Sequence, residues 1–344
     1  MSYPWRRRFT HGVRKKGGAM NDRMRILIAY DGSDHARAAL DDLRRAGLPR
    51  EGEALIVSVA DVLVSPSMSI KEIAGAALTS RRVTSAIMQA KTRAFRALEE
   101  ARGFASEARR LFEAGFLGWG VRAEPMTGTP SWELLQKGDL WGADLIVVGS
   151  HGRSALGRFF LGSVSKKVAT ESRCSVRVAR RAVEKPGDEP VRIIIGVDGS
   201  PGAEEAVRQV GGRWWTKGTE IRLIAVDDGV SPTRIADILP TATAMIDASN
   251  EEVAVKARTM LKWAVEGLRD IGLSVSAEIK NGDPQRILID QAHKWEADSI
   301  FVGSRGLNTS LETFRAGSVS TGLVTSAPCS VEVVRKSKES HNSC

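Results

Sequence analysis

An internal duplication is the feature of this sequence that most limits what the chain can fold into. Short segments of the second half repeat segments of the first half at one constant offset of 154 residues. The matched positions are Gly128 and Pro130 with Gly282 and Pro284, Trp141 with Trp295, Ala143-Asp144 with Ala297-Asp298, and Val148-Gly149 with Val302-Gly303. One offset shared by so many positions indicates two copies of one structural unit. The 344 residues are therefore expected to form two similar domains.

Each copy opens with an apolar segment that ends in Asp-Gly-Ser. Residues 25–33 read Arg-Ile-Leu-Ile-Ala-Tyr-Asp-Gly-Ser, and residues 192–200 read Arg-Ile-Ile-Ile-Gly-Val-Asp-Gly-Ser. Both segments predict a buried strand, a tight turn, and a helix capped by a serine or aspartate. Asp31 and Asp198 therefore occupy the same place in the two copies.

Strands and helices are predicted to alternate through the rest of each copy. In the first copy, strands are predicted at 55–59, 121–127, 145–149 and 174–179, with a long helical region at roughly 70–115. In the second copy, the corresponding ranges are 221–226, 274–280 and 329–334 for strands and roughly 233–271 for the helical region. Such alternation favours a parallel, doubly wound sheet that binds ligands beyond the carboxyl ends of its strands. The predicted fold class is α/β, with two five-stranded Rossmann-like sheets in tandem.

A glycine-rich loop follows the fourth apolar strand of each copy. Residues 145–152 read Leu-Ile-Val-Val-Gly-Ser-His-Gly, and Gly162-Ser163 follows after nine intervening residues. Glycine lets the backbone approach a ligand closely, and the helix predicted after Gly162 begins with N–H groups that lack intrahelical partners. Such a helix start attracts phosphate. The second copy repeats the pattern at Gly303, Gly306 and Gly317, with ten residues instead of nine before its last glycine.

Five segments are predicted along the chain. They are a basic, disordered leader at 1–22, a first domain at 23–181, a linker at 182–190, a second domain at 191–336 and a tail at 337–344. Residues 1–20 carry six of the nine net positive charges, so the domains are nearly neutral, which argues against a nucleic-acid-binding protein. No run of about 18 apolar residues predicts a membrane span. The three cysteines lack disulfide or zinc spacing and favour a cytoplasmic location.

The aspartate after strand one, the glycine loop and the duplication together resemble the tandem form of the universal stress protein family. The resemblance covers nearly all of residues 24–336. Nucleotide-binding members of that family carry Gly-x2-Gly-x9-Gly-Ser/Thr after strand four, an aspartate after strand one and a valine in strand two. The resemblance implies a fold like that of the adenine nucleotide alpha hydrolases, with ATP as the ligand. It also implies that the two copies pack as an intramolecular pseudo-dimer through their last strands.

The resemblance assigns a set of residues in each copy to ATP. In the first copy they are Gly149, Gly152, Gly162 and Ser163 at the phosphates, with Val164 and Ser165 nearby, Asp31 at the ribose or at Mg bound to the phosphates, and the backbone of Val59 at adenine. In the second copy the matching residues are Asp198, Val226, Gly303, Gly306, Gly317 and Ser318. The second loop is one residue longer, so we expect it to hold ATP weakly or differently, although a loop can absorb one residue.

Several of these residues also have a structural interpretation. Asp31 can cap a turn, since Asp-Gly is a common turn pair. His151 lies between two loop glycines and either contacts phosphate or is a solvated loop residue. Cys174 and Cys329 open the last strand of each copy in an apolar run, which favours inert core thiols, and the two matched tryptophans are expected to be packing residues.

Three functions are compatible with the sequence. The first is a nucleotide-dependent stress-response regulator, in which ATP orders the loop from Gly152 to Gly162 and a partner protein binds the altered surface. The second is a slow ATP hydrolase or an enzyme that phosphorylates itself at Ser163 or Ser165, although the sequence has no P-loop motif with its phosphate-binding lysine. The third is a nucleotide-free scaffold whose long helical regions bind a protein or a lipid. The sequence does not decide whether two chains also pair as a homodimer.

Overall fold

The structure is a computed structural model that describes residues 23–62, 81–152, 161–180, 189–227, 243–306 and 316–336. The predicted leader and tail and most of the predicted linker lie outside the described residues. So do two segments of the glycine loops, 153–160 and 307–315, and the first parts of the two predicted helical regions, 70–80 and 233–242.

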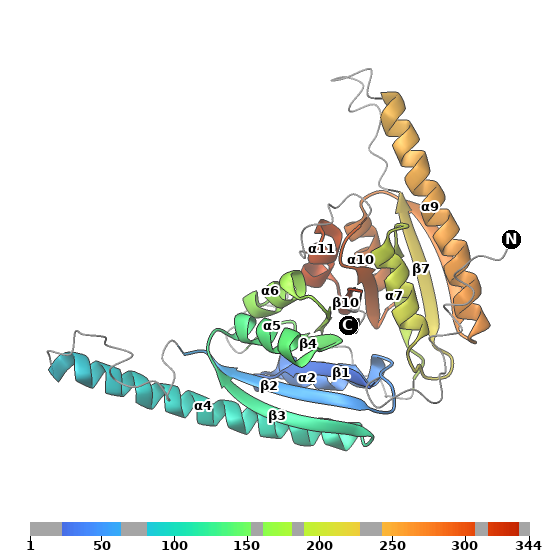
Figure 1. The fold of residues 1–344 in the computed structure, drawn as a ribbon. Coiled ribbons are helices and arrows are strands. Elements are labelled where there is room, and N and C mark those ends of the chain that lie inside the picture. Colours follow the sequence, from blue (N-terminus) through green and yellow to red (C-terminus); the bar gives the residue numbers. More distant parts are fainter. Residues whose placement is uncertain are drawn as a thin grey trace, which may run out of the picture.

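The strands of the described residues form one continuous ten-stranded sheet in the order β3-β2-β1-β4-β5-β10-β9-β6-β7-β8 (Figure 1). The first copy supplies β1 (Met24–Ala29), β2 (Gly52–Ala60), β3 (Trp119–Thr127), β4 (Leu145–Gly149) and β5 (Ser175–Ala179). The second supplies β6 (Arg192–Val197), β7 (Glu220–Asp227), β8 (Ser274–Asn281), β9 (Ser299–Gly303) and β10 (Ser330–Val334). Within each copy the strands are parallel, and β5 pairs with β10 antiparallel. The α/β prediction is confirmed, but the two predicted sheets are joined into one, because pairing at the seam removes an open edge from each.

Helices cover both faces of this sheet. In the first copy they are α2 (Asp34–Asp42), the 3-10 helix η1 (Leu43–Arg45), α4 (Arg81–Gly115), α5 (Pro130–Trp141) and α6 (Ser163–Glu171), and in the second α7 (Pro201–Gly211), α9 (Thr243–Asp270), α10 (Pro284–Lys294) and α11 (Ser318–Ser326). None of these helices of the described ranges combines the length and the apolar composition needed to cross a membrane.

The hydrophobic core shows how the two copies are joined. On one face, α5, α6, α10 and α11 lie together (Figure 1) over a single core cluster that contains residues of both copies, such as Leu134 and Val168 with Leu288 and Leu323. On the other face each copy has its own cluster, under α2 and α4 in the first and under α7 and α9 in the second. The face that carries α6 and α11 is therefore built jointly by the two copies.

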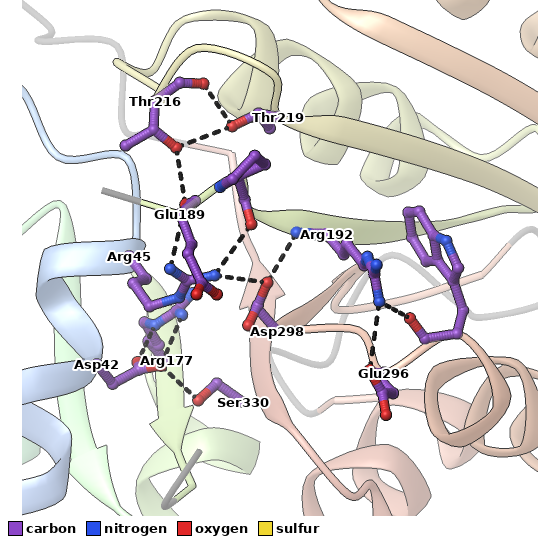
Figure 2. Close-up of polar contacts among 12 residues, drawn as sticks. Asp42, Arg45, Arg177, Glu189, Arg192, Thr216, Thr219, Glu296, Asp298 and Ser330 are labelled. Atoms are coloured by element: carbon purple, nitrogen blue, oxygen red, sulfur yellow. Dashed lines mark hydrogen bonds and ion pairs between the residues drawn. The ribbon is translucent and has the colours of Figure 1, made fainter. Parts of the chain in front are cut away.

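The seam between β5 and β10 contains a buried ionic network. Arg177 lies opposite Glu332 in the antiparallel register, and both side chains are fully buried. Arg177 donates to both carboxylate oxygens of Asp42 on α2, with Nε–Oδ2 and Nη2–Oδ1 distances of 2.5 and 3.1 Å. Arg213 donates to Glu332. Figure 2 shows Asp42 between Arg177 and Ser330, whose Oγ donates to Oδ1 of Asp42 at 2.7 Å.

A second buried ion pair joins the first copy to the second near the linker. Nη2 of Arg45 on η1 lies 3.0 Å from Oδ2 of Asp298, which also accepts a hydrogen bond from the backbone N–H of Arg192 at 2.8 Å (Figure 2). Arg45 further donates to the backbone carbonyls of Glu189 and Pro190. One arginine thus holds the end of the linker, the start of the second copy and the first copy together.

Candidate functional site

The turn after β1 and the loop after β4 meet at the carboxyl edge of the sheet. β1 and β4 are neighbouring parallel strands, so the residues that follow them lie side by side. A Cβ atom placed on Gly152 would lie 3.0 Å from Oδ2 of Asp31. The second copy has the same arrangement, with a Cβ on Gly306 only 2.8 Å from Oδ2 of Asp198. Each copy therefore brings its aspartate and its second loop glycine together, with little room for any side chain on that glycine.

Asp31 has a structural role in the turn. Its Oδ1 accepts a hydrogen bond from the N–H of Ser33 at 3.0 Å, and Ser33 Oγ accepts from the N–H of Ala36 at 3.1 Å, which caps α2. Asp198 and Ser200 repeat these contacts in the second copy, at 2.9 and 3.1 Å. The prediction that Asp31 caps a turn is thus correct for one carboxylate oxygen, while the other oxygen lies against the glycine loop.

Gly149 is required by close packing against the start of α2. A Cβ on Gly149 would lie 2.8 Å from both the carbonyl carbon and the carbonyl oxygen of His35. The equivalent Gly303 would place a Cβ 2.6 Å from the carbonyl carbon of Gly202. The backbone of α2 therefore occupies the space that a side chain at Gly149 would need. A phosphate contact at Gly149, as predicted, would be made by its main chain.

The end of the glycine loop is fastened to the end of β4. The N–H of Gly162 donates to the carbonyl of Ser150 at 2.8 Å, and Oγ of Ser165 donates to the carbonyl of Gly149 at 2.6 Å. Helix α6 starts at Ser163 behind Gly162 and, within the described structure, no side chain caps it. An uncapped helix start presents N–H groups to an anion. The predicted residues Gly162, Ser163 and Ser165 are thus brought together with Gly149 at this edge.

The second copy repeats this arrangement with one difference. The N–H of Gly317 donates to the carbonyl of Ser304 at 2.7 Å, and α11 begins at Ser318 without a side-chain cap in the described residues. Ser320, the counterpart of Ser165, donates instead to the carbonyls of Ser304 and Gly317, at 3.3 and 3.1 Å. The two loops are therefore fastened by different hydrogen bonds.

His151 is buried, so of the two alternatives left open for it the solvated loop residue is wrong. Only 4% of its surface is exposed. Its Nδ1 lies 3.1 Å from Oγ of Ser150, which lies 3.3 Å from Nδ1 of His35, and the two imidazole rings are 4.7 Å apart. Nε2 of His151 is buried without a hydrogen-bond partner among the described residues. Burial lowers the pKa of His151, and the nearby charges of His35 and Arg180 lower it further.

The depressed pKa of His151 predicts that the protein loses stability in acid. A histidine whose pKa is lower in the folded state than in the unfolded state binds protons more readily when the protein is unfolded. Its contribution to the free energy of unfolding is therefore intact above the ordinary pKa of about 6.5 and is lost as the pH falls through that value. We expect the melting temperature to fall between about pH 7.5 and pH 5.5, and to fall less in His151→Gln. The control is His293→Gln, a substitution of an exposed histidine, which should leave the pH profile of the melting temperature as in wild type. An identical pH profile for His151→Gln and wild type would contradict the prediction.

The remaining predicted residues occupy less central positions. Val59 lies at the end of β2, half-buried against the shared core, and Val226 lies correspondingly on β7. Val164 packs on the same core from α6. The matched tryptophans pack there too, each under an arginine guanidinium. Burial raises the pKa of Cys329 to about 12 and raises that of Cys174 as well, so both thiols stay protonated at neutral pH and have little nucleophilic reactivity.

The fold and the site together define a class of protein. Two Rossmann-like units share one sheet, and each carries an aspartate turn, a glycine loop and an uncapped helix start at its carboxyl edge. A sequence model of the universal stress protein family matches residues 23–180 and, a second time, residues 191–335. The chain belongs to the universal stress protein family and carries its domain twice.

Individual relatives agree with this assignment. The universal stress protein YxiE of Bacillus subtilis is 32% identical over 158 residues, which cover 45% of this chain and 98% of that protein. A universal stress protein of Mycolicibacterium smegmatis is 28% identical over 193 residues, which cover 56% of this chain and 62% of that protein. Among solved structures, a universal stress protein from Archaeoglobus fulgidus is 22% identical, covers 90% of this chain and 98% of its own, and has a TM-score of 0.57. At this identity the structural likeness shows the fold.

Proposed function

We propose that this universal stress protein is a regulatory module that binds ATP at the carboxyl edge of its first copy. The observation that carries the proposal is the approach of the Asp31 carboxylate to Gly152 beside the uncapped start of α6. A carboxylate next to an anion-binding helix start suits a phosphate chain that carries a divalent cation, because the main-chain N–H groups bind the phosphate oxygens and the carboxylate binds the cation.

The residues of the first copy fit such a ligand. The main chain at Gly149, Gly152 and Gly162 and the first N–H groups of α6 would hold the phosphates. Asp31 would hold the ribose or a phosphate-bound Mg ion, and the main chain of Val59 would meet adenine at the end of β2. When bound, ATP supplies a polyanion, and the chain supplies donors fixed by the bonds from Gly162 to Ser150 and from Ser165 to Gly149.

The second copy would bind ATP more weakly. It retains Asp198, Gly306 and an uncapped α11, but Ser320 does not make the bond to the strand-end glycine that Ser165 makes. In this proposal, ATP bound to the first copy changes the surface around its glycine loop, and a partner protein binds that changed surface.

The proposal predicts that charge removal at Asp31 weakens ATP binding by about tenfold or more, a loss of about 1.4 kcal/mol. Asp31→Asn is the variant of choice, because asparagine keeps an oxygen acceptor for the turn to Ser33 and removes only the charge. Gly162→Val should have a similar effect, because its Cβ would already be in van der Waals contact with Cα of His151 at 3.5 Å and its two γ-methyl groups would then crowd the loop. Calorimetry with ATP and Mg measures both.

Matched variants of the second copy are the controls. Asp198→Asn and Gly317→Val should leave the tighter binding event unchanged. ATP affinity that is equal in wild type, Asp31→Asn and Gly162→Val would refute a site in the first copy. If freshly purified protein releases no nucleotide on denaturation and millimolar ATP gives no thermal shift, the scaffold interpretation is favoured. ATP turnover above that of Gly162→Val would favour an enzyme.

A further inference from the structure

The last strand of the second copy ends in an arginine that reaches the first copy. Arg335 follows β10, and only 7% of the residue's surface is exposed. Its Nη2 donates to the carbonyl of Ala169 at 2.7 Å and to that of Thr170 at 3.4 Å, both in the last turn of α6. The final carbonyls of a helix have no intrahelical partner, and a cation there also complements the negative end of the helix dipole. Arg335 therefore caps α6 from the other copy.

Arg180 makes the reciprocal contact. It follows β5, at the position that corresponds to Arg335, and its Nη2 donates to the carbonyls of Val324 and Thr325 at 2.9 and 2.7 Å. These carbonyls belong to the last turn of α11. The backbone N–H groups of the two arginines are also bound symmetrically across the seam, to Oγ of Ser330 and Ser175.

The electrostatic setting shows that these arginines are held by helix ends and not by carboxylates. Neither makes an ion pair within the described residues. Burial lowers the pKa of Arg335 to about 10 against the opposing effect of Cys174, and Arg305 in the second glycine loop lowers it further. Burial likewise lowers the pKa of Arg180. A guanidinium buried in this way needs the helix carbonyls as partners, because an unpaired buried charge is costly.

The capped helices are the ones that begin at the glycine loops. Helix α6 has nine residues, so only about 13 Å separates its capped end from its start behind Gly162. The capped end also touches the second loop directly, since the N–H of Ala316, just before Gly317, donates to the carbonyl of Thr170 at 3.0 Å. A short, well-packed helix transmits a displacement of one end to the other.

We propose that Arg335 and Arg180 are positioning residues, each of which holds the phosphate-binding helix of the opposite copy in place. The inference rests on the proposed function for its ligand. It assigns the second copy a role that does not depend on its own nucleotide occupancy, because Arg335 supports the first site whether or not the second is filled.

The test combines hydrogen exchange with nucleotide binding in the full-length chain. In Arg335→Gln, amides at the end of α6 should exchange roughly tenfold faster without any ligand, while those of α11 keep their wild-type protection. Arg180→Gln should show the opposite pattern. In an Asp198→Asn background, in which ATP binding reports mainly the first site, Arg335→Gln should weaken ATP binding by about three- to tenfold. Arg335→Lys should restore part of both losses, and exposed Lys336→Gln should cause neither.

The possible outcomes separate this inference from the proposed function. Unchanged exchange in α6 for Arg335→Gln would overturn the positioning role, whatever the nucleotide result. Faster exchange in α6 with unchanged ATP affinity would overturn the link from the cap to the site. If wild-type protein binds no ATP, the proposed function fails, and the exchange pattern alone then decides whether the arginines hold the helices. Equal loss of protection in α6 and α11 would indicate general destabilisation and would also overturn the inference.

Discussion

Replacing Arg177 with methionine is expected to lower the free energy of unfolding by about 3–5 kcal/mol. Methionine fills much of the same volume, so the loss measures the charge and not a cavity. Burial by itself would lower the pKa of Arg177, but Asp42 and Glu332 outweigh burial and raise it above its ordinary value. Removal of the guanidinium leaves the buried Asp42 carboxylate with the hydroxyl of Ser330 as its remaining side-chain partner among the described residues. Urea denaturation followed by circular dichroism measures the effect.

An exposed ion pair provides the matched control for Arg177→Met. Arg102 lies 2.7 Å from Glu99 on the surface of α4, with more than 40% of each side chain exposed. Arg102→Met should change the free energy of unfolding by less than about 0.5 kcal/mol. A loss below about 1 kcal/mol for Arg177→Met would show that the buried network does not hold the seam.

Adding a single methyl group at Gly149 is expected to destabilise the protein by about 1–3 kcal/mol. In Gly149→Ala, the new Cβ would lie 2.8 Å from carbonyl atoms of His35 and 3.1 Å from the amide nitrogen of Ala36. Backbone atoms cannot rotate away, so α2 must shift as a unit. Because the turn of Asp31 leads directly into α2, a shift of α2 should also disturb the candidate site. Urea denaturation measures the stability loss.

The same substitution in α4 should have the opposite sign. Gly103 lies inside α4, and a Cβ there would have no heavy atom within 4 Å. Gly103→Ala is therefore expected to raise the free energy of unfolding by roughly 0.5–1 kcal/mol, because alanine favours the helix. If the two variants shifted stability in the same direction, close packing at Gly149 would not explain why glycine is needed there.

The sequence predicted the fold through periodicity and repetition. The strand predicted at 55–59 is the centre of β2, which extends from Gly52 to Ala60 because its ladder with β3 continues on both sides of that segment. The added residues are Gly52, Glu53, Ala54 and Ala60, which are small or charged and do not continue the run of large apolar side chains from which the strand was predicted. The two copies were expected to pack through their last strands, and β5 does pair with β10, which makes the sheet continuous. Its ionic seam was not foreseen, since Asp42 and Arg177 are 135 residues apart.

The candidate site was predictable where the two copies agree. Asp31 and Gly152 meet as their counterparts Asp198 and Gly306 do, so repetition identified them. His35 was missed because its counterpart is Gly202, and a residue present in one copy leaves no repeated signal. Arg180 and Arg335 did leave one, since both close a Val-x-Val-x-Arg segment. Their role depends on contacts across the seam, which no local pattern encodes.

The pairing of Arg177 with Glu332 has a consequence for how the two copies can associate. These residues occupy the same position in the two copies, and each faces the other across the seam. In a symmetric pair of identical subunits, a residue at that point faces its own duplicate. Two arginines or two glutamates would then repel each other without water to screen them. An arginine can face a glutamate at this central position only when the two paired strands differ in sequence. The seam therefore favours pairing of the first copy with the second and disfavours pairing of either copy with another of its own kind.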